Sequence, residues 1–151
     1  PETYGLGLAY QANEKLMLTM DYKRSNWSKV MKDFHMTFTS AGDVSLDMKL
    51  PQNWVDQDVF MAGFSYQASD ALVLRMGGNF ANNPVPDYDM HPLFPAIIKE
   101  HYMIGFGYRF SKASTVDFAY SYAPEVTASN ALGVIVSHSQ NNAQFIYSYR
   151  Y

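Results

Sequence analysis

The chain has 151 residues, a formal net charge of −3 and no cysteine, and 48% of its residues are apolar. Lysine and arginine are scattered, so the sequence offers no basic patch for nucleic acid, and the lack of cysteine excludes disulfides and thiolate metal sites. The apolar runs are far shorter than the roughly 20 residues that a membrane-spanning helix needs. The N-terminus lacks the basic and apolar regions of a signal peptide, so we expect a mature product or a piece of something longer.

Apolar and polar residues alternate with period two, as they do in β-strands whose two faces meet different surroundings. The first segment places Tyr4, Leu6 and Leu8 on one face and Gly5 and Gly7 on the other. Strands of about nine to eleven residues are long enough to cross the hydrocarbon layer of a membrane. The pattern predicts an all-β fold, an antiparallel transmembrane β-barrel. In chain order the alternating segments are 3–11, 16–23, 60–67, 72–80, 101–110, 115–122 and 144–151.

The connections between these segments alternate in length. Short turns are predicted near residues 12–14, 69–70 and 111–114, and long loops near 28–56, 82–98 and 124–140. Barrels of the bacterial outer membrane have short periplasmic turns and longer extracellular loops. Counting back from a periplasmic C-terminus places every short turn in the periplasm and every long loop outside the cell.

A soluble β-sandwich with one buried face would alternate in the same way. Two features favour the barrel instead. Tyr and Phe stand near both ends of most predicted strands, as the aromatic girdles at membrane interfaces require. The opposite face combines glycine with isolated charges, which suits a wet or plugged lumen.

The number of predicted strands is odd, although single-chain bacterial barrels close with an even number. The loop over 28–56 contains two further alternating stretches, 30–39 and 44–50, which are expected to form a hairpin above the membrane. Counting both stretches as wall strands would still give an odd number. The count therefore leaves the closure of the barrel unexplained.

Several motifs along the chain resemble the C-terminal half of the FadL family of outer-membrane transporters for long-chain fatty acids and other hydrophobic compounds. They cover nearly the whole chain. They are Asp21-Tyr22 through Trp27-Ser28, Leu50-Pro51-Gln52-Asn53-Trp54-Val55-Asp56, Gly63-Phe64-Ser65-Tyr66, Leu74-Arg75-Met76-Gly77-Gly78, Pro84-Val85-Pro86, Gly105-Phe106-Gly107-Tyr108 and Asp117-Phe118-Ala119-Tyr120.

The resemblance implies a 14-stranded barrel plugged by an N-terminal hatch, of which residues 1–151 would be the C-terminal part of a single barrel domain. Half of such a barrel explains the odd strand count, and the hatch and gate would lie upstream. The implied function is passive uptake of long-chain fatty acids or other hydrophobic small molecules, including aromatic hydrocarbons. The alternative is a structural or adhesive outer-membrane barrel without transport. The implied partners are outer-membrane lipid and lipopolysaccharide, a hydrophobic substrate and the barrel-assembly machinery.

The loop around residues 90–98 is apolar, punctuated by proline and predicted to be extracellular, which favours capture of a hydrophobic ligand. These side chains could instead pack on neighbouring loops and close the barrel mouth. Phe34, Met36 and Phe38 have the same two possible roles, and for them packing is the more favoured. The candidate substrate contacts are Phe34, Met36, Leu93, Phe94, Ile97 and Ile98. A carboxylate head group would find cations near the outer mouth in Lys23, Arg24, Lys29, Lys32 and Lys99.

Isolated charges on the predicted luminal face are expected to form ion pairs, because an unpaired buried charge is costly. Tyr151, in register with Tyr149 and Tyr147, resembles the terminal aromatic signal read by the assembly machinery. The four histidines show no metal-ligand spacing, and no enzyme or cofactor is predicted. The candidate luminal network is Asp21, Lys23, Arg75, Arg109, Asp117 and Arg150.

Overall fold

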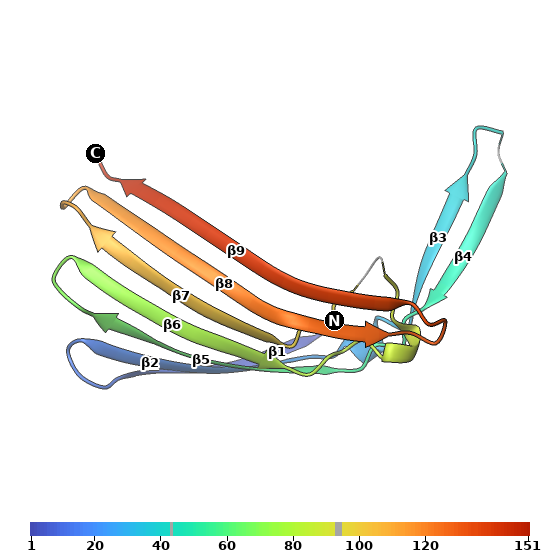
Figure 1. The fold of residues 1–151 in the computed structure, drawn as a ribbon, viewed down its shortest axis with the longest axis horizontal. Helices are drawn as coiled ribbons and strands as arrows, with labels where there is room; N and C mark the ends of the chain where they lie inside the picture. Colours follow the sequence, from blue (N-terminus) through green and yellow to red (C-terminus); the bar gives the residue numbers. More distant parts are fainter. Residues whose placement is uncertain (43, 93–94) are drawn as a thin grey trace.

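The computed structural model describes residues 1–42, 44–92 and 95–151, and it consists of strands and two short 3₁₀ helices (Figure 1). All seven predicted wall strands are present. The first five start and end within a few residues of their predictions, and the last two are longer at one end. No helix in the described ranges is long and apolar enough to span a membrane. The elements are β1 (Thr3–Gln11), β2 (Leu16–Ser25), η1 (Trp27–Lys29), β3 (Asp33–Thr39), β4 (Ser45–Pro51), β5 (Gln57–Gln67), β6 (Leu72–Ala81), η2 (Asp87–Asp89), β7 (Glu100–Arg109), β8 (Ser114–Ser129) and β9 (Ile135–Tyr149).

Seven strands form one antiparallel sheet in the order β1-β2-β5-β6-β7-β8-β9, and β3 pairs with β4 in a separate hairpin. The large sheet is a curved wall with the short turns at one end (Figure 1). The hairpin stands away from the wall at the other end, which we call the loop end. The hairpin predicted within residues 28–56 is thus formed and does not add to the wall.

The register keeps like residues opposite one another on each face. Leu6 pairs with Tyr22, Tyr22 with Phe60, and Phe60 with Phe80, so one face of the wall is continuously apolar. We call this surface the apolar face and the opposite one, rich in glycine and polar residues, the polar face. Leu6 is 79% exposed, and no second layer covers the sheet in the described part of the chain. A soluble sandwich would bury this face, so the exposed apolar face favours a membrane wall.

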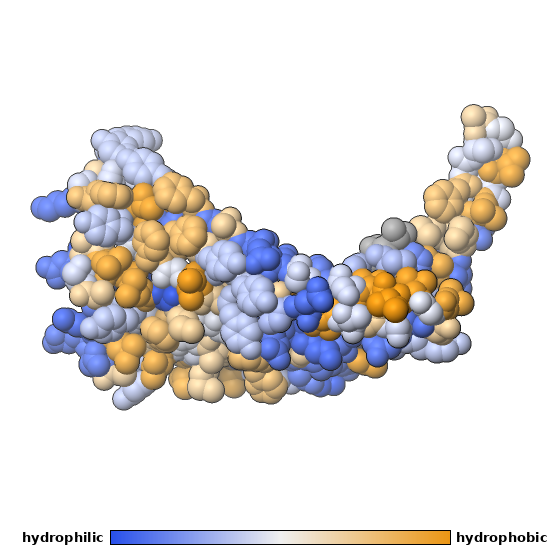
Figure 2. Space-filling model, in the orientation of Figure 1, coloured by the Kyte–Doolittle hydropathy of each residue, from blue (hydrophilic) through white to orange (hydrophobic). Residues whose placement is uncertain are grey.

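Aromatic rings border the apolar face at both ends. Near the loop end, Tyr22 lies 5.0 Å from Phe60 between ring centroids, and Phe80 lies 5.9 Å from Tyr102. Near the short turns, Tyr108 contacts Phe110. In Figure 2, apolar side chains gather over the part of the visible surface that lies toward the short turns. A more hydrophilic band follows toward the loop end. Two aromatic rims around an apolar band are typical of a lipid-facing barrel wall.

The two outermost strands of the wall, β1 and β9, each pair on one side only among the described residues. Their remaining backbone N–H and C=O groups therefore have no strand partner. In a membrane these groups require a closed sheet, because lipid supplies no hydrogen bonds. The seven strands are a barrel wall with two open edges.

The segment over 124–140, predicted as a long loop, is instead mostly strand. β8 continues to Ser129 and β9 begins at Ile135. A bulge interrupts their pairing, since two β8 residues, Pro124 and Glu125, lie opposite one residue between the pairs Ala123–Gln140 and Val126–His138. The bulge shifts the alternation by one residue, which hides the strand from a search for strict period two.

Candidate functional site

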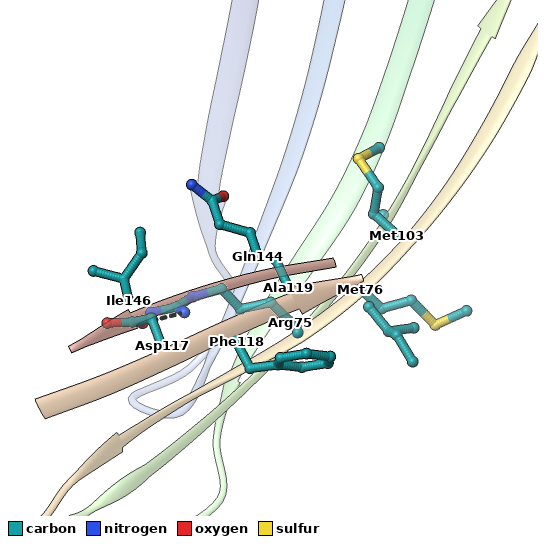
Figure 3. A pocket seen from close by; sticks show the side chains of 11 residues that line it. Arg75, Met76, Met103, Asp117, Phe118, Ala119, Gln144 and Ile146 are labelled. Carbon is teal, nitrogen blue, oxygen red and sulfur yellow. Dashed lines mark hydrogen bonds and ion pairs between the residues drawn. The ribbon is translucent and has the colours of Figure 1, made fainter. Parts of the chain in front are cut away.

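A hollow of about 470 Å³ lies against the wall in the region of β6 to β9 (Figure 3). Its surface is mostly apolar, and it is lined from both faces of the sheet: Met76, Ile104 and Phe118 belong to the apolar face, and the other lining residues belong to the polar face. Arg75 and Asp117 are its charged members. Its lining residues are Arg75, Met76, Gly77, Met103, Ile104, Gly105, Asp117, Phe118, Ala119, Gln144 and Ile146.

Small residues create this hollow. Gly77 of β6 lies opposite Gly63 of β5, and Gly105 of β7 lies opposite Ala119 of β8. A Cβ atom on Gly105 would lie 2.7 Å from the carbonyl oxygen of Phe118, closer than side chains tolerate. The backbone itself is therefore the floor of the hollow, while Met103 and Ile146 give it flexible apolar sides.

Arg75 and Asp117 form an ion pair across the polar face, with 3.0 Å between Nη1 and Oδ1. Arg75 lies on β6 and Asp117 on β8, so the pair crosses β7 at Gly107. A Cβ atom there would lie 2.7 Å from Asp117 Oδ1 and 3.3 Å from Arg75 Nη1. Glycine at this position leaves the path of the side chains open.

The other members of the predicted network do not join this pair. Arg109 donates a hydrogen bond to the carbonyl oxygen of Asp70 in a short turn. Asp21, Lys23 and Arg150 make no ion pair within the described ranges. The structure thus brings two of the six residues together as charges and leaves the others spread over the wall.

At the loop end, the connection between β6 and β7 packs into a small apolar core. Met90 and Ile97 are buried with Val85, and partly buried Trp54, Val126, Ala128 and Val136 surround them. Asn130 Nδ2 donates to the Met90 carbonyl at 3.0 Å, and His138 Nδ1 lies 3.1 Å from the Pro95 carbonyl oxygen. These contacts hold the loop against the hairpin that joins β8 to β9.

This loop lies on the polar side of the wall. Val136 and His138 share the face of Gln144 and Ile146, because they occupy alternate positions of β9. Among the predicted substrate contacts, Ile97 is fully buried in the small core and Ile98 is partly exposed. Leu93 and Phe94 fall outside the described residues. Phe34 and Met36 lie on the separate β3–β4 hairpin.

Two of the five predicted cations at the mouth are engaged by carboxylates. Arg24 bonds Asp56 at 3.1 Å and Asp58 at 3.0 Å, and Lys29 pairs with Glu2. Hydrogen bonds from Ser28 lower the pKa of Asp56, and the Lys29 bond lowers the pKa of Glu2. These pairs join positions far apart in the sequence, so no local signal could have found them.

Sequence reasoning missed most residues that line the hollow, among them Met103, Gln144 and Ile146. Their shared face was visible in the alternation, but their neighbourhood depends on the strand register. Tyr151 follows the end of β9 and is fully exposed. No group of three or more His, Asp or Glu side chains in the described ranges is placed to hold a metal ion.

Comparison with known proteins identifies the family of this chain. Residues 1–145 match the model of the family described as "Outer membrane protein transport protein (OMPP1/FadL/TodX)". The toluene transporter TodX of Pseudomonas putida is 30% identical and superposes with a TM-score of 0.77, over 99% of this chain and 34% of that one.

Two further solved structures agree with this match. The Ralstonia pickettii toluene transporter TbuX is 29% identical with a TM-score of 0.75, over 99% of this chain and 33% of that one. A Pseudomonas aeruginosa FadL homologue, at 21% identity, 95% and 33% coverage and a TM-score of 0.65, shares the fold. A comparison with curated protein sequences finds no match.

The chain spans about a third of the length of these solved structures. That share fits a wall with two open edges. The chain belongs to the outer membrane protein transport family (OMPP1/FadL/TodX), and its seven-stranded sheet is part of the wall of a β-barrel in the bacterial outer membrane.

Proposed function

We propose that the protein takes up hydrophobic small molecules passively across the outer membrane, and that this chain supplies the C-terminal part of the channel wall. The apolar face then contacts lipid, and the polar face lines the lumen. The observation that carries the proposal is the apolar character of the luminal face around Gly77 and Gly105, where Met103, Ala119 and Ile146 lie beside the neutralised Arg75–Asp117 pair. A channel for ions or sugars would be expected to present polar side chains there.

A neutral hydrocarbon suits this hollow better than a fatty acid. Arg75 is the one cation among the residues that line it, and Asp117 already neutralises it. Burial of a CH₂ group contributes about 0.8 kcal/mol, so a toluene-sized molecule gains on the order of 5 kcal/mol if fully covered. Such weak binding is compatible with rapid release. TodX and TbuX are toluene transporters, which supports monoaromatic compounds as the substrate class.

At the mouth, loop 82–98 is proposed to receive the ligand from outside. Ile97 anchors the loop through the small core, and Ile98, together with Leu93 and Phe94, is the proposed ligand contact. An apolar loop held on the luminal side of the extracellular rim gives a hydrophobic molecule a first surface out of water.

The proposed partners of the outer surface are lipid and lipopolysaccharide around the aromatic rims, and the barrel-assembly machinery at the C-terminal aromatic residues. Tyr147 and Tyr149 lie on the apolar face of the last strand. Tyr151 continues this row of alternate positions.

The test fills the hollow in the full-length protein. Ala119→Phe places a ring in the lumen, and we expect uptake of labelled toluene to fall by at least about tenfold, as expected of a blocked path. Ala143→Phe is the matched control, since Ala143 is exposed on the lipid face of the neighbouring strand. Heat-modifiable migration on gels checks that both variants form barrels.

Equal uptake by both variants would remove the hollow from the transport path. Comparing labelled toluene with labelled palmitate separates hydrocarbon uptake from fatty acid uptake. A full-length protein that moves neither compound would favour the structural or adhesive alternative, to which the protruding β3–β4 hairpin is suited.

A further inference from the structure

The β3–β4 hairpin has two unlike faces. Its cross-strand pairs Phe34–Leu50, Met36–Met48 and Phe38–Leu46 place six apolar side chains on one face. We call these six residues the hairpin apolar face. Phe38 is 56% and Leu46 59% exposed, so the outer half of this face meets solvent in the described chain.

The opposite face is polar and already satisfied. Asp33 receives Lys49 Nζ and His35 Nε2 at 2.7 Å each, and Lys49 lowers the pKa of that carboxyl. Thr37 donates to Asp47 at 2.7 Å. This polar face is suited to water, so the apolar face is the one side of the hairpin that favours a cover.

The hairpin does not supply that cover itself. It stands clear of the wall and joins it through a narrow base, where the Gln52 N–H donates to the Lys32 carbonyl and the Trp54 N–H to the Met31 carbonyl (Figure 1). An isolated two-stranded hairpin is marginally stable in water, and it becomes stable when one face packs on something else.

The base of the hairpin lies beside the start of β1. The Asn26 N–H donates to the Glu2 carbonyl at 2.9 Å, and the Glu2 side chain pairs with Lys29 of η1. At this edge of the wall β1 lacks an outer neighbour, and the chain spans only about a third of its solved relatives. The rest of the barrel must therefore continue from this rim.

We infer that the extracellular segment directly upstream of Pro1, through which the chain enters β1, folds over the hairpin and packs apolar side chains on Met36, Phe38, Leu46 and Met48. The contact joins the N-terminal part of the barrel to this one above the membrane. It fixes the hairpin at one side of the mouth. The inference rests on the open edge and the placement of Glu2, and it is independent of the substrate.

Other occupants fit less well. Lipid chains end at the aromatic rim around Tyr22 and Phe60, whereas β3 rises a further seven residues, or roughly 20 Å, beyond the base of the hairpin. The sugars of lipopolysaccharide are polar and would not cover an apolar face. A second copy of the protein would have to compete with a tethered segment whose effective concentration is in the millimolar range.

The experiment uses the full-length protein in outer membranes. The photo-crosslinking residue p-benzoylphenylalanine is placed at Phe38, on the hairpin apolar face, and separately at Thr37, on the polar face of the same strand. After irradiation, mass spectrometry identifies the peptide joined to each position. We expect position 38 to crosslink within one polypeptide to the segment that precedes Pro1, and position 37 to do so about tenfold less, because it points the other way.

A crosslink from position 38 to lipopolysaccharide, to a second copy, or to no part of the upstream segment would overturn the inference. A second variant guards against a badly placed probe. Met48→Asp should increase protease cleavage of the upstream segment, whereas Thr39→Asp, on the polar face opposite Ser45, should not. Equal cleavage in the two variants would also contradict the contact. Neither readout requires transport, so the outcome is distinguishable from that of the uptake test.

Discussion

Gly107 lies where the Arg75 side chain crosses β7 to reach Asp117, and this single position shows how the luminal wall is built. A strand loses stability when it contains glycine, because glycine has the largest backbone entropy to lose and no side chain to pack. Here the lost stability leaves space for an ion pair that spans three strands. The glycines of the luminal face therefore leave space for neighbouring side chains, although they do not favour strand formation.

Gly105→Ala should crowd the backbone carbonyl oxygen of Phe118 and lower the free energy of unfolding by about 1–3 kcal/mol, the usual range for overpacking. Gly5→Ala is the control, since a Cβ atom there meets its nearest atom, the Tyr22 carbonyl oxygen, at an ordinary 3.7 Å. Denaturant unfolding of the full-length protein in lipid vesicles measures both. Equal stability of the two variants would contradict the steric role of Gly105.

Acidification should loosen the base of the β3–β4 hairpin around η1. The pKa of Asp56 is lowered by Ser28, and that of Glu2 by Lys29, from ordinary values of 3.8 and 4.5. A carboxyl with a lowered pKa in the folded state stabilises the fold above its unfolded pKa, and this contribution disappears as pH falls through the folded value. The loss therefore lies below about pH 4.

Hydrogen exchange, corrected for the intrinsic rate at each pH, checks this expectation. Protection of residues 26–30 should decrease between pH 6 and pH 3, while the hydrogen bonds between β6 and β7 should keep theirs. Asp56→Asn should already reduce that protection at pH 6. Protection that is independent of pH would show that these carboxylates do not hold the base.

At the scale of elements, the β8 bulge decides which side chains support the loop between β6 and β7. Without it, the alternation of β8 would continue unchanged and point Val126 and Ala128 toward the outer surface. With the extra residue, both side chains face the lumen and pack on Val85, Met90 and Ile97. One inserted residue thus converts two strand ends into the support of an extracellular loop.

Deleting Glu125 should remove the bulge and reverse the facing of Val126 and Ala128. The loop over 84–98 would then lose part of its apolar core and become susceptible to protease added outside intact cells. Glu125→Ala keeps the residue count and should leave the loop protected. Cleavage of the loop in both variants would mean that the glutamate side chain, rather than the bulge, holds the loop.

At the scale of the whole molecule, the sheet is a wall that requires continuation on both sides. Edge strands β1 and β9 cannot leave their backbone groups unpaired in lipid, so this part of the barrel gains its stability only with the rest. Above the membrane, the outer half of the hairpin apolar face, at Phe38 and Leu46, is also exposed within the described residues, and the upstream segment proposed above would cover it.

The sequence by itself determined the strands, the two faces of the wall and the end of the wall at which the short turns lie. These properties follow from period-two alternation, from aromatic residues such as Tyr22 and Tyr108 near strand ends, and from the contrast of short turns with long loops. All three are local patterns, and local patterns can be recognised when the rest of the fold is unknown.

Only the tertiary structure decided which side chains meet. Arg75 and Asp117 were both candidates, but their pairing depends on the register of three strands. From the sequence alone, Arg109 or Arg150 could equally have been the partner of Asp117. Ile97 was a candidate ligand contact, and its burial depends on a bulge that breaks the alternation. Contacts between distant segments are set by register and by irregularities, and neither is encoded in the periodicity of a single strand.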